Sequence, residues 1–235
     1  LLHDRLIPEP LLDYARRDAE RIAVGKCRGR PGTSQETINR KMIDLARQGK
    51  KVARLKGGDP FIFGRGGEEL SVLRAAGVRT TVIPGISAAQ GCAAELGVPL
   101  THRDRDRQVV FASGHDAAPE GAGEPERWAG LARTGQTLAL YMAGSRISAI
   151  CQQLRAHGLP DSRSAIVVAN GTTAGRHWVA GDLASLPHRA ANAGSEGPVL
   201  LLIGENIREA VAGSGITGAR SCPGHPSQGS PSLTQ

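Results

Sequence analysis

The stretch that decides the fold is RLKGGDPFIFGRGGEE, residues 54–69. The polar and apolar residues from Lys51 to Leu55 predict a short β-strand, and two glycines follow it closely, at 57 and 58. Glycine adopts positive φ without steric cost, so the backbone at this turn can approach a ligand closely. A helix is expected next, because Glu68 and Glu69 would stand in a first turn where the helix dipole favours negative charge. The stretch predicts a strand, a ligand loop and a helix, and an ordinary βα connection with spare glycines stays open as the alternative.

The loop does not match the common nucleotide-binding or nucleophile motifs. It lacks the Gly-x-x-x-x-Gly-Lys-Ser/Thr spacing, and Glu69 stands where a dinucleotide fingerprint beginning Gly64-x-Gly66 needs its third glycine. Farther along, Ala89 replaces the last glycine of a Gly-x-Ser-x-Gly nucleophile turn. An adenosyl ligand of a different kind stays open.

Strands and helices alternate outward from this loop. Strands are expected at 21–24, 51–55 and 79–83, and helices at 35–48, 68–76 and 87–96, the last capped by Ser87. Such alternation implies an α/β fold with a largely parallel sheet and helices on its faces.

A second set of elements follows a charged segment. Strands are expected at 108–112, 136–142, 164–169 and 199–203, with a helix at 145–157. We place a domain junction near Thr101–Arg107, which gives domains at 1–104 and 105–212, with a cleft between them. The remainder, 213–235, is rich in Gly, Ser and Pro and is expected to be disordered.

Composition limits the class of protein. The 235 residues are 40% hydrophobic and contain no apolar run near the ~20 residues of a membrane helix, so no membrane association is expected. We read no export signal at the first residues and expect a cytoplasmic protein. The four cysteines are scattered without a Cys-x-x-Cys pair, which favours reduced thiols and no metal site.

The charge balance favours an anionic partner. Lys and Arg number 29 against 22 Asp and Glu, a net charge of +7 that is spread along the chain. With 3% aromatic residues and no helix-turn-helix or zinc-finger pattern, nucleic acid is not the expected partner. A polycarboxylate metabolite fits the charge better, although most of the arginines are expected to face water.

The residues from Asp4 to Glu205 resemble the tetrapyrrole methylase family. The resemblance rests on the stretch at 54–69 together with VIPGISAA at 82–89 and VPLTHR at 98–103, in the same order. It implies a two-domain tetrapyrrole methylase fold with a mostly parallel first sheet and a mixed second sheet. It further implies a homodimer that uses S-adenosylmethionine to methylate uroporphyrinogen III twice, giving precorrin-2 for sirohaem or cobalamin. Another precorrin methyltransferase of the family, or an inactive truncated fragment that binds no cofactor, stay as alternatives.

The resemblance also assigns roles to individual residues. Asp4 corresponds to the proton acceptor and Lys26 to the proton donor of the reaction, although either could be a solvated surface residue. The positions that correspond to cofactor contacts are Gly57, Gly58, Asp59, Ile62, Ser87, Ala88, Met142 and Gly171. Without the family, Asp59 would be a turn residue, Met142 core filling and the Asn-Gly pair at Gly171 a plain turn.

The sequence departs from the family pattern in two places. Family members have a strand and a Gly-Pro-Gly loop ahead of the aspartate that corresponds to Asp4, and this sequence begins three residues before it. We expect the sheet and the cofactor site to lack what that segment supplies. The second departure is Arg30-Pro31-Gly32, where relatives have a His-Ser pair on the substrate side.

Overall fold

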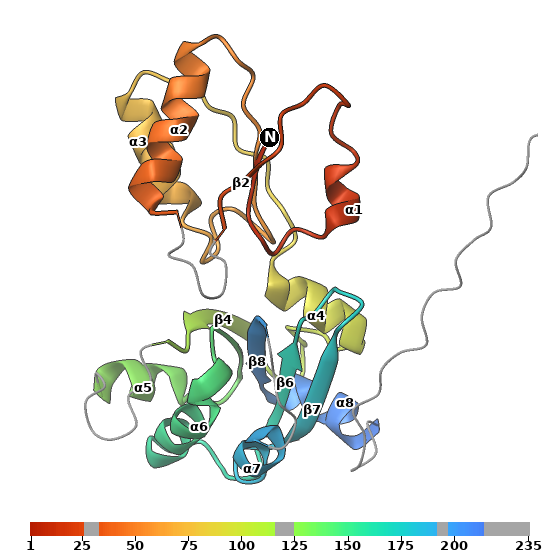
Figure 1. The fold of residues 1–235 in the computed structure, drawn as a ribbon. Coiled ribbons are helices and arrows are strands. Elements are labelled where there is room, and N and C mark those ends of the chain that lie inside the picture. The colour runs from red at the N-terminus through yellow and green to blue at the C-terminus, as the bar shows by residue number, and fades with distance from the viewer. Residues whose placement is uncertain (26–32, 116–124, 192–196, 214–235) are drawn as a thin grey trace, which may run out of the picture. The chain divides into compact units, whose positions relative to one another are not determined.

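The computed structural model describes residues 1–25, 33–115, 125–191 and 197–213 (Figure 1). The chain divides into two compact units, Leu1–Gln90 and Gly91–Gln235. The division therefore falls inside helix α4 (Ala88–Leu96), upstream of the junction expected at 104/105. The domain junction near Thr101–Arg107 stays a prediction; in that segment, buried Asp106 pairs with Arg163 at 2.6 Å. Beyond Gly213, the tail expected to be disordered lies outside the described residues.

The first unit is built on a parallel sheet in the order β2-β1-β3. Its strands are β1 (Leu2–His3), β2 (Ile22–Ala23) and β3 (Arg54–Leu55). Leu2 lies opposite Ile22 on one side and Arg54 on the other, so β1 is the central strand of the three. The parallel arrangement predicted for this part of the chain is confirmed.

Helices flank this sheet. They are α1 (Glu9–Leu12), α2 (Gln35–Arg47) and α3 (Gly66–Ala75), and α2 and α3 lie side by side while α1 lies across the sheet from them (Figure 1). The Ser34 hydroxyl caps α2 by accepting a hydrogen bond from the Thr37 amide at 3.1 Å. A small core forms where the sheet meets α2 and α3, made of Leu2, Val24, Ile38, Met42 and Leu73.

The strand predicted at 79–83 is wrong. These residues have no regular structure and pair with none of the described strands. Among the described strands, β3 pairs only with β1. A strand is stable only when its backbone groups find partners, so the apolar pattern there was not sufficient.

The second unit is built on a mixed sheet in the order β4-β5-β8-β6-β7. Its strands are β4 (Gln108–Ser113), β5 (Gln136–Tyr141), β6 (Ser164–Ala169), β7 (His177–Asp182) and β8 (Val199–Ile203). Only β4 and β5 run parallel, and the remaining pairs are antiparallel. The mixed sheet is as expected, but β7 was missed, because this edge strand is only partly buried and does not alternate cleanly.

Helices and short 3₁₀ turns cover the second sheet. They are α5 (Pro125–Leu131), η1 (Gly144–Arg146), α6 (Ile147–Ala156), α7 (Leu186–Ala191), η2 (Glu205–Ile207) and α8 (Arg208–Gly213). The main core joins α5, α6 and α7 to one face of the sheet, with Trp128, Ile150, Leu154, Leu186 and Leu201 among its members. The alternating residues Ile166 and Val168 are also buried, so both faces of β6 are covered.

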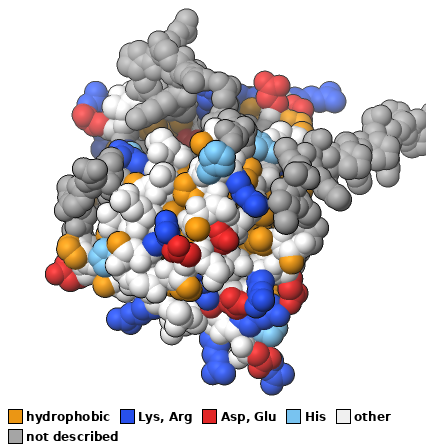
Figure 2. All heavy atoms as spheres, turned by 90° about the horizontal axis from the view of Figure 1, so that it is seen from below, with side chains coloured by type: hydrophobic (Ala, Val, Ile, Leu, Met, Phe, Trp, Pro, Cys, Tyr) orange, Lys and Arg blue, Asp and Glu red, His pale blue; other side chains and the backbone are white. Residues whose placement is uncertain are grey.

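On the face drawn in Figure 2, basic and acidic side chains are interspersed with uncharged ones. None of the helices in the described ranges combines the length and hydropathy that crossing a bilayer requires.

Candidate functional site

In the first unit, the glycine loop after β3 lies directly against the loop 84–87. Gly58 has φ of +72°, in the left-handed region that glycine favours. A Cβ added to Gly85 would lie 2.3 Å from the Gly58 carbonyl oxygen, which is closer than any real contact. A Cβ added to Gly58 would lie 3.7 Å from the Ala88 amide nitrogen. Glycine at 85 therefore lets the two loop backbones meet. The backbones of Ser87 and Ala88 lie beside Gly58.

The carboxylate of Asp59 ties these two loops together. One of its oxygens accepts a hydrogen bond from the Phe61 amide at 2.8 Å, and the other accepts one from the Gly85 amide at 3.1 Å. The Gly85 amide, followed by that of Phe61, lowers the pKa of Asp59 below its ordinary value. The turn role of Asp59 is thus visible, and its predicted contact with the cofactor stays a prediction, as does that of partly buried Ile62 in the same turn.

Ser87 holds a buried hydroxyl with no partner. The residue is 3% exposed, and its Oγ makes no hydrogen bond to any described residue. The expected cap of α4 by the Ser87 hydroxyl is therefore wrong, and the side-chain oxygen of Gln90 instead accepts from the Ser87 amide at 3.0 Å. An unpaired buried hydroxyl costs free energy. A bound molecule with a polar group at this point would remove that cost.

Asp4 follows β1 directly, at the carboxyl end of the parallel sheet. In open α/β sheets this is the edge at which ligands bind. The Asp4 Oδ1 atom accepts a hydrogen bond from Arg54 Nη2 at 2.5 Å, and Lys56 Nζ is 3.7 Å from Oδ2. A Cβ added to Gly57 would lie 3.7 Å from the Leu6 side chain, so the chain after Asp4 runs beside the glycine loop.

Behind Asp4 lies an ion-pair network that sequence reasoning missed. Glu69 Oε1 is 3.0 Å from Lys56 Nζ and 3.3 Å from Arg54 Nη2. The sequence predicts Glu69 only as an acid in the first turn of a helix. One signal was available: Arg54 and Lys56 are two residues apart on a short strand and its end, so their side chains share a face and need a common counter-charge.

The predicted proton donor, Lys26, lies outside the described residues, as does Arg30-Pro31-Gly32.

The second unit carries the other two predicted cofactor residues on strained turns. Met142 directly follows β5, has φ of +57° and is 51% exposed. A bulky side chain rarely adopts this conformation, and such residues gather at functional sites. The neighbours of Gly171, Asn170 and Thr172, also have positive φ, at 52° and 63°.

Gly171 is packed against the end of α4. A Cβ added to it would lie 2.2 Å from the Sγ atom of Cys92. The Thr172 amide donates to Glu95 at 2.7 Å, which fixes the turn to the same helix. Burial, and to a lesser extent Glu95, raise the pKa of the Cys92 thiol to about 11. Cys92 is therefore a buried packing residue beneath the turn.

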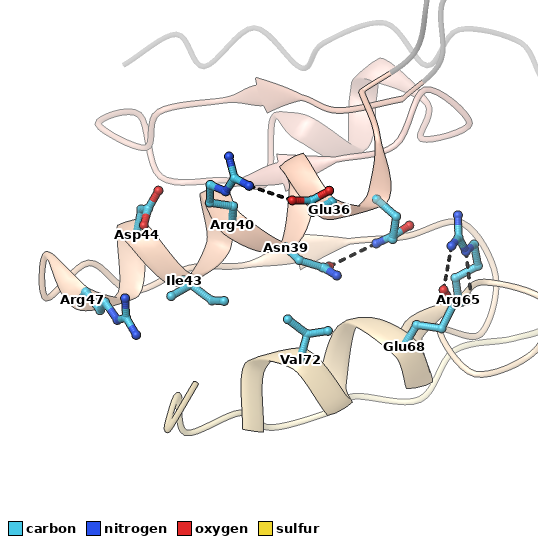
Figure 3. Close-up of a pocket in the computed structure, with 10 residues that line it drawn as sticks. Glu36, Asn39, Arg40, Ile43, Asp44, Arg47, Arg65, Glu68 and Val72 are labelled. Carbon is cyan, nitrogen blue, oxygen red and sulfur yellow. Dashed lines mark hydrogen bonds and ion pairs between the residues drawn. The ribbon is translucent and has the colours of Figure 1, made fainter. Parts of the chain in front are cut away.

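A separate groove runs between α2 and α3 (Figure 3). Its volume is about 470 Å³, and Ile43 and Val72 form its apolar floor between the ion pairs Glu36–Arg40 and Arg65–Glu68. None of the predicted site residues lines this groove. Within the described ranges no cluster of three or more His, Cys, Asp or Glu residues could hold a metal ion.

The predicted residues thus fall into two groups. Gly57, Gly58, Asp59, Ser87 and Ala88 come together in the first unit, with Asp4 at the adjoining edge of the sheet. Met142 and Gly171 belong to the second unit. The first group offers two close backbones, an anion and an unpaired hydroxyl, which suits a polar ligand held largely by main-chain groups.

Comparison with known proteins identifies relatives of this chain. Siroheme synthase of Gluconacetobacter diazotrophicus is 46% identical over 211 residues, which are 90% of this chain and 44% of that protein. Siroheme synthase 1 of Serratia proteamaculans is 49% identical over 207 residues, 88% of this chain and 42% of that protein. The chain therefore spans less than half the length of these relatives.

Solved structures share the fold. Uroporphyrin-III C-methyl transferase from Thermus thermophilus, complexed with S-adenyl homocysteine, is 33% identical with a TM-score of 0.71, covering 88% of this chain and 86% of that one. A cobalt precorrin-4 methyltransferase has a TM-score of 0.75 at 22% identity, which supports the fold alone. The family described as Tetrapyrrole (Corrin/Porphyrin) Methylases matches residues 1–187. The chain belongs to the tetrapyrrole methylase family.

Proposed function

We propose that this chain transfers methyl groups from S-adenosylmethionine to two carbons of uroporphyrinogen III, giving precorrin-2. Support comes from the siroheme synthases and from the Thermus thermophilus enzyme, whose structure contains S-adenyl homocysteine. The observation in this molecule that carries the proposal is the buried, unpartnered Ser87 hydroxyl beside two glycine-lined backbones.

The described residues fit such a cofactor. Gly57, Gly58 and Ala88 would offer main-chain groups, Ser87 a hydroxyl, and Asp59 a carboxylate able to accept from a ribose hydroxyl or the amino group. The proposal also assigns Ile62, Met142 and Gly171 to the cofactor. When bound, S-adenosylmethionine supplies a methyl group already activated as a sulfonium.

Asp4 and Lys26 would handle protons at the substrate. A pyrrole carbon that gains a methyl group leaves positive charge on the macrocycle, which must then lose a proton. The Asp4 carboxylate, at the edge of the sheet, would accept that proton, and Lys26 would donate one. Orientation of the reactants and exclusion of water would supply much of the rate, so loss of Asp4 slows the reaction without abolishing it.

The partners follow from the same assignment. The substrate is a polycarboxylate, which agrees with a net charge of +7. We further propose that the protein acts as a homodimer in the cytoplasm and that its product serves sirohaem or cobalamin synthesis.

The experiment that tests the function is a methyl-transfer assay on the purified chain. Uroporphyrinogen III is supplied with S-adenosylmethionine carrying a labelled methyl group, and the product is identified by mass. Gain of two methyl groups supports the proposal. Methylation only of a later precorrin assigns another reaction of the family. Absence of calorimetric binding of S-adenosylmethionine assigns an inactive fragment.

A further inference from the structure

Four charged side chains meet where β1 and β3 end. Arg54 and Lys56 come from β3 and its end, Asp4 follows β1, and Glu69 comes from α3. Glu69 Oε1 accepts hydrogen bonds from Arg54, from Lys56 and from Gln35 of α2, the last at 3.0 Å. Two cations and two carboxylates thus balance in charge, and three elements are joined through one carboxylate oxygen.

The members of this network differ in burial. The Glu69 side chain is 5% exposed, Lys56 9% and Arg54 12%, whereas Asp4 is 27% exposed. Buried charges remain ionised in a protein only when they are paired and hydrogen-bonded. Glu69 therefore acts as the buried anchor, and Asp4 is the member that reaches towards solvent.

The two oxygens of Asp4 are not equivalent. Oδ1 is held by Arg54 Nη2 at 2.5 Å, and the same guanidinium donates through Nη1 to the Leu55 carbonyl at 3.1 Å. Oδ2 is 3.7 Å from Lys56 Nζ, beyond hydrogen-bonding distance, and accepts no hydrogen bond from the described residues. One oxygen is fixed by a hydrogen bond, and the other has only the ion pair with Lys56 at 3.7 Å, so its lone pairs can accept a proton.

We propose that Arg54 is a positioning residue for Asp4: it fixes Oδ1 so that Oδ2 faces the proton that the methylated macrocycle must lose, while Glu69 holds the guanidinium from behind. This inference rests on the proposed function. In the step concerned, a lone pair of Oδ2 forms the new O–H bond. The covalent bond between the macrocycle and that hydrogen breaks, and its electron pair returns to the cationic macrocycle. Arg54 touches neither reactant, and its influence on the rate passes through Asp4.

The first test compares steady-state kinetics of Arg54→Gln with the wild type. Misplacement of a reacting group by about 1 Å can cost on the order of a hundredfold in rate, so we expect kcat to fall by up to that factor. The KM for S-adenosylmethionine should stay within about twofold, because uniform binding is not affected. The kcat of Arg54→Lys should lie between those of Arg54→Gln and the wild type. Arg40→Ala removes an exposed arginine paired with Glu36 on α2 and serves as the matched control, with unchanged kcat.

A second set separates positioning from folding. Arg54→Gln leaves Glu69 with Lys56 and Gln35 as partners, whereas the double variant Arg54→Gln/Glu69→Gln also takes the Glu69 carboxylate from buried Lys56 and should be less stable than the single variant. The kcat of the double variant should be no higher than that of Arg54→Gln, because Asp4 loses its guanidinium in both. Guanidinium ion added to Arg54→Ala should restore part of kcat. If Arg54 served only the fold, the added ion would not restore kcat.

The outcomes separate the proposed function from the role of Arg54. No methyl transfer by the wild type overturns the proposed function and this inference with it. Wild-type activity together with an unchanged kcat in Arg54→Gln, or full recovery of kcat in the double variant, overturns only the role of Arg54.

Discussion

At the scale of single residues, Ser87 offers a test of whether this loop is a ligand site. Its buried Oγ has no partner among the described residues, so Ser87→Ala removes no hydrogen bond from the free protein. We expect the free energy of unfolding to stay the same or rise, while affinity for S-adenosylhomocysteine falls about tenfold, the value of one hydrogen bond. Denaturant unfolding and calorimetric titration measure the two quantities.

The matched control is Ser71→Ala on α3, whose exposed hydroxyl donates to the Gly67 carbonyl at 2.9 Å. It should leave affinity unchanged. A Ser87→Ala protein that loses stability but keeps its affinity would show that the hydroxyl serves the fold alone.

Asp59 predicts a local response to acid. Because the amides of Gly85 and Phe61 lower its pKa, the loop contact is complete above the ordinary value of 3.8 and is lost as pH falls through the lower, folded value. The amide resonance of Gly85 should therefore titrate with a midpoint below 3.8, followed by NMR. Asp59→Asn should remove this titration, and a midpoint above 3.8 would contradict the assigned hydrogen bonds.

At the scale of elements, the contact between α4 and the turn after β6 can be measured by a double-mutant cycle. Gly171→Ala places a Cβ 2.2 Å from Cys92 Sγ and should destabilise the protein by about 1–3 kcal/mol, the usual cost of overpacking. Cys92→Ala removes that sulfur, so the double variant should recover part of the loss relative to the sum of the single changes. Thermal or denaturant unfolding of all four proteins gives the coupling. Strict additivity would show that the two sites do not touch.

The same scale shows what the sequence could predict. Buried strands such as β6 and β8 are continuous apolar runs, and α2 carries a cap and an apolar stripe, so local pattern was sufficient for them. The strand at 79–83 failed because a strand depends on a neighbour that local pattern does not reveal.

The candidate site was predictable in part for a similar reason. The glycine loop at 57–58 is a local signal, whereas the meeting of Asp4 with Arg54 and Glu69 joins residues far apart in the chain. The family resemblance located Asp4 but contained no information about the charges behind it. The unpaired state of the Ser87 hydroxyl also required coordinates, because by sequence a serine before a helix is a cap.

At the scale of the whole molecule, the two sheets should differ in local stability. Each strand of the first sheet is two residues long, whereas those of the second sheet have five or six and enclose the main core. Amide hydrogen exchange should therefore be slowest in β5, β6 and β8 and faster in β1, β2 and β3. Exchange followed by mass spectrometry measures this, and equal protection of both sheets would contradict it.

This difference suits the proposed chemistry. Loops that bind ligands and change conformation come from the less stable parts of proteins. The glycine loop follows one of the short strands, so a ligand bound there would stabilise the part of the molecule with the fewest ladder hydrogen bonds.

The sulfur packed under Gly171 has a practical consequence. At pH 8 few Cys92 side chains are thiolates, and the turn covers the atom, so a water-soluble alkylating reagent can modify it only when that turn lifts away. The rate of modification, followed at the peptide that contains Cys92, then measures how often the turn opens. Ligands that hold Gly171 in place would slow this modification, which would report occupancy without catalytic turnover.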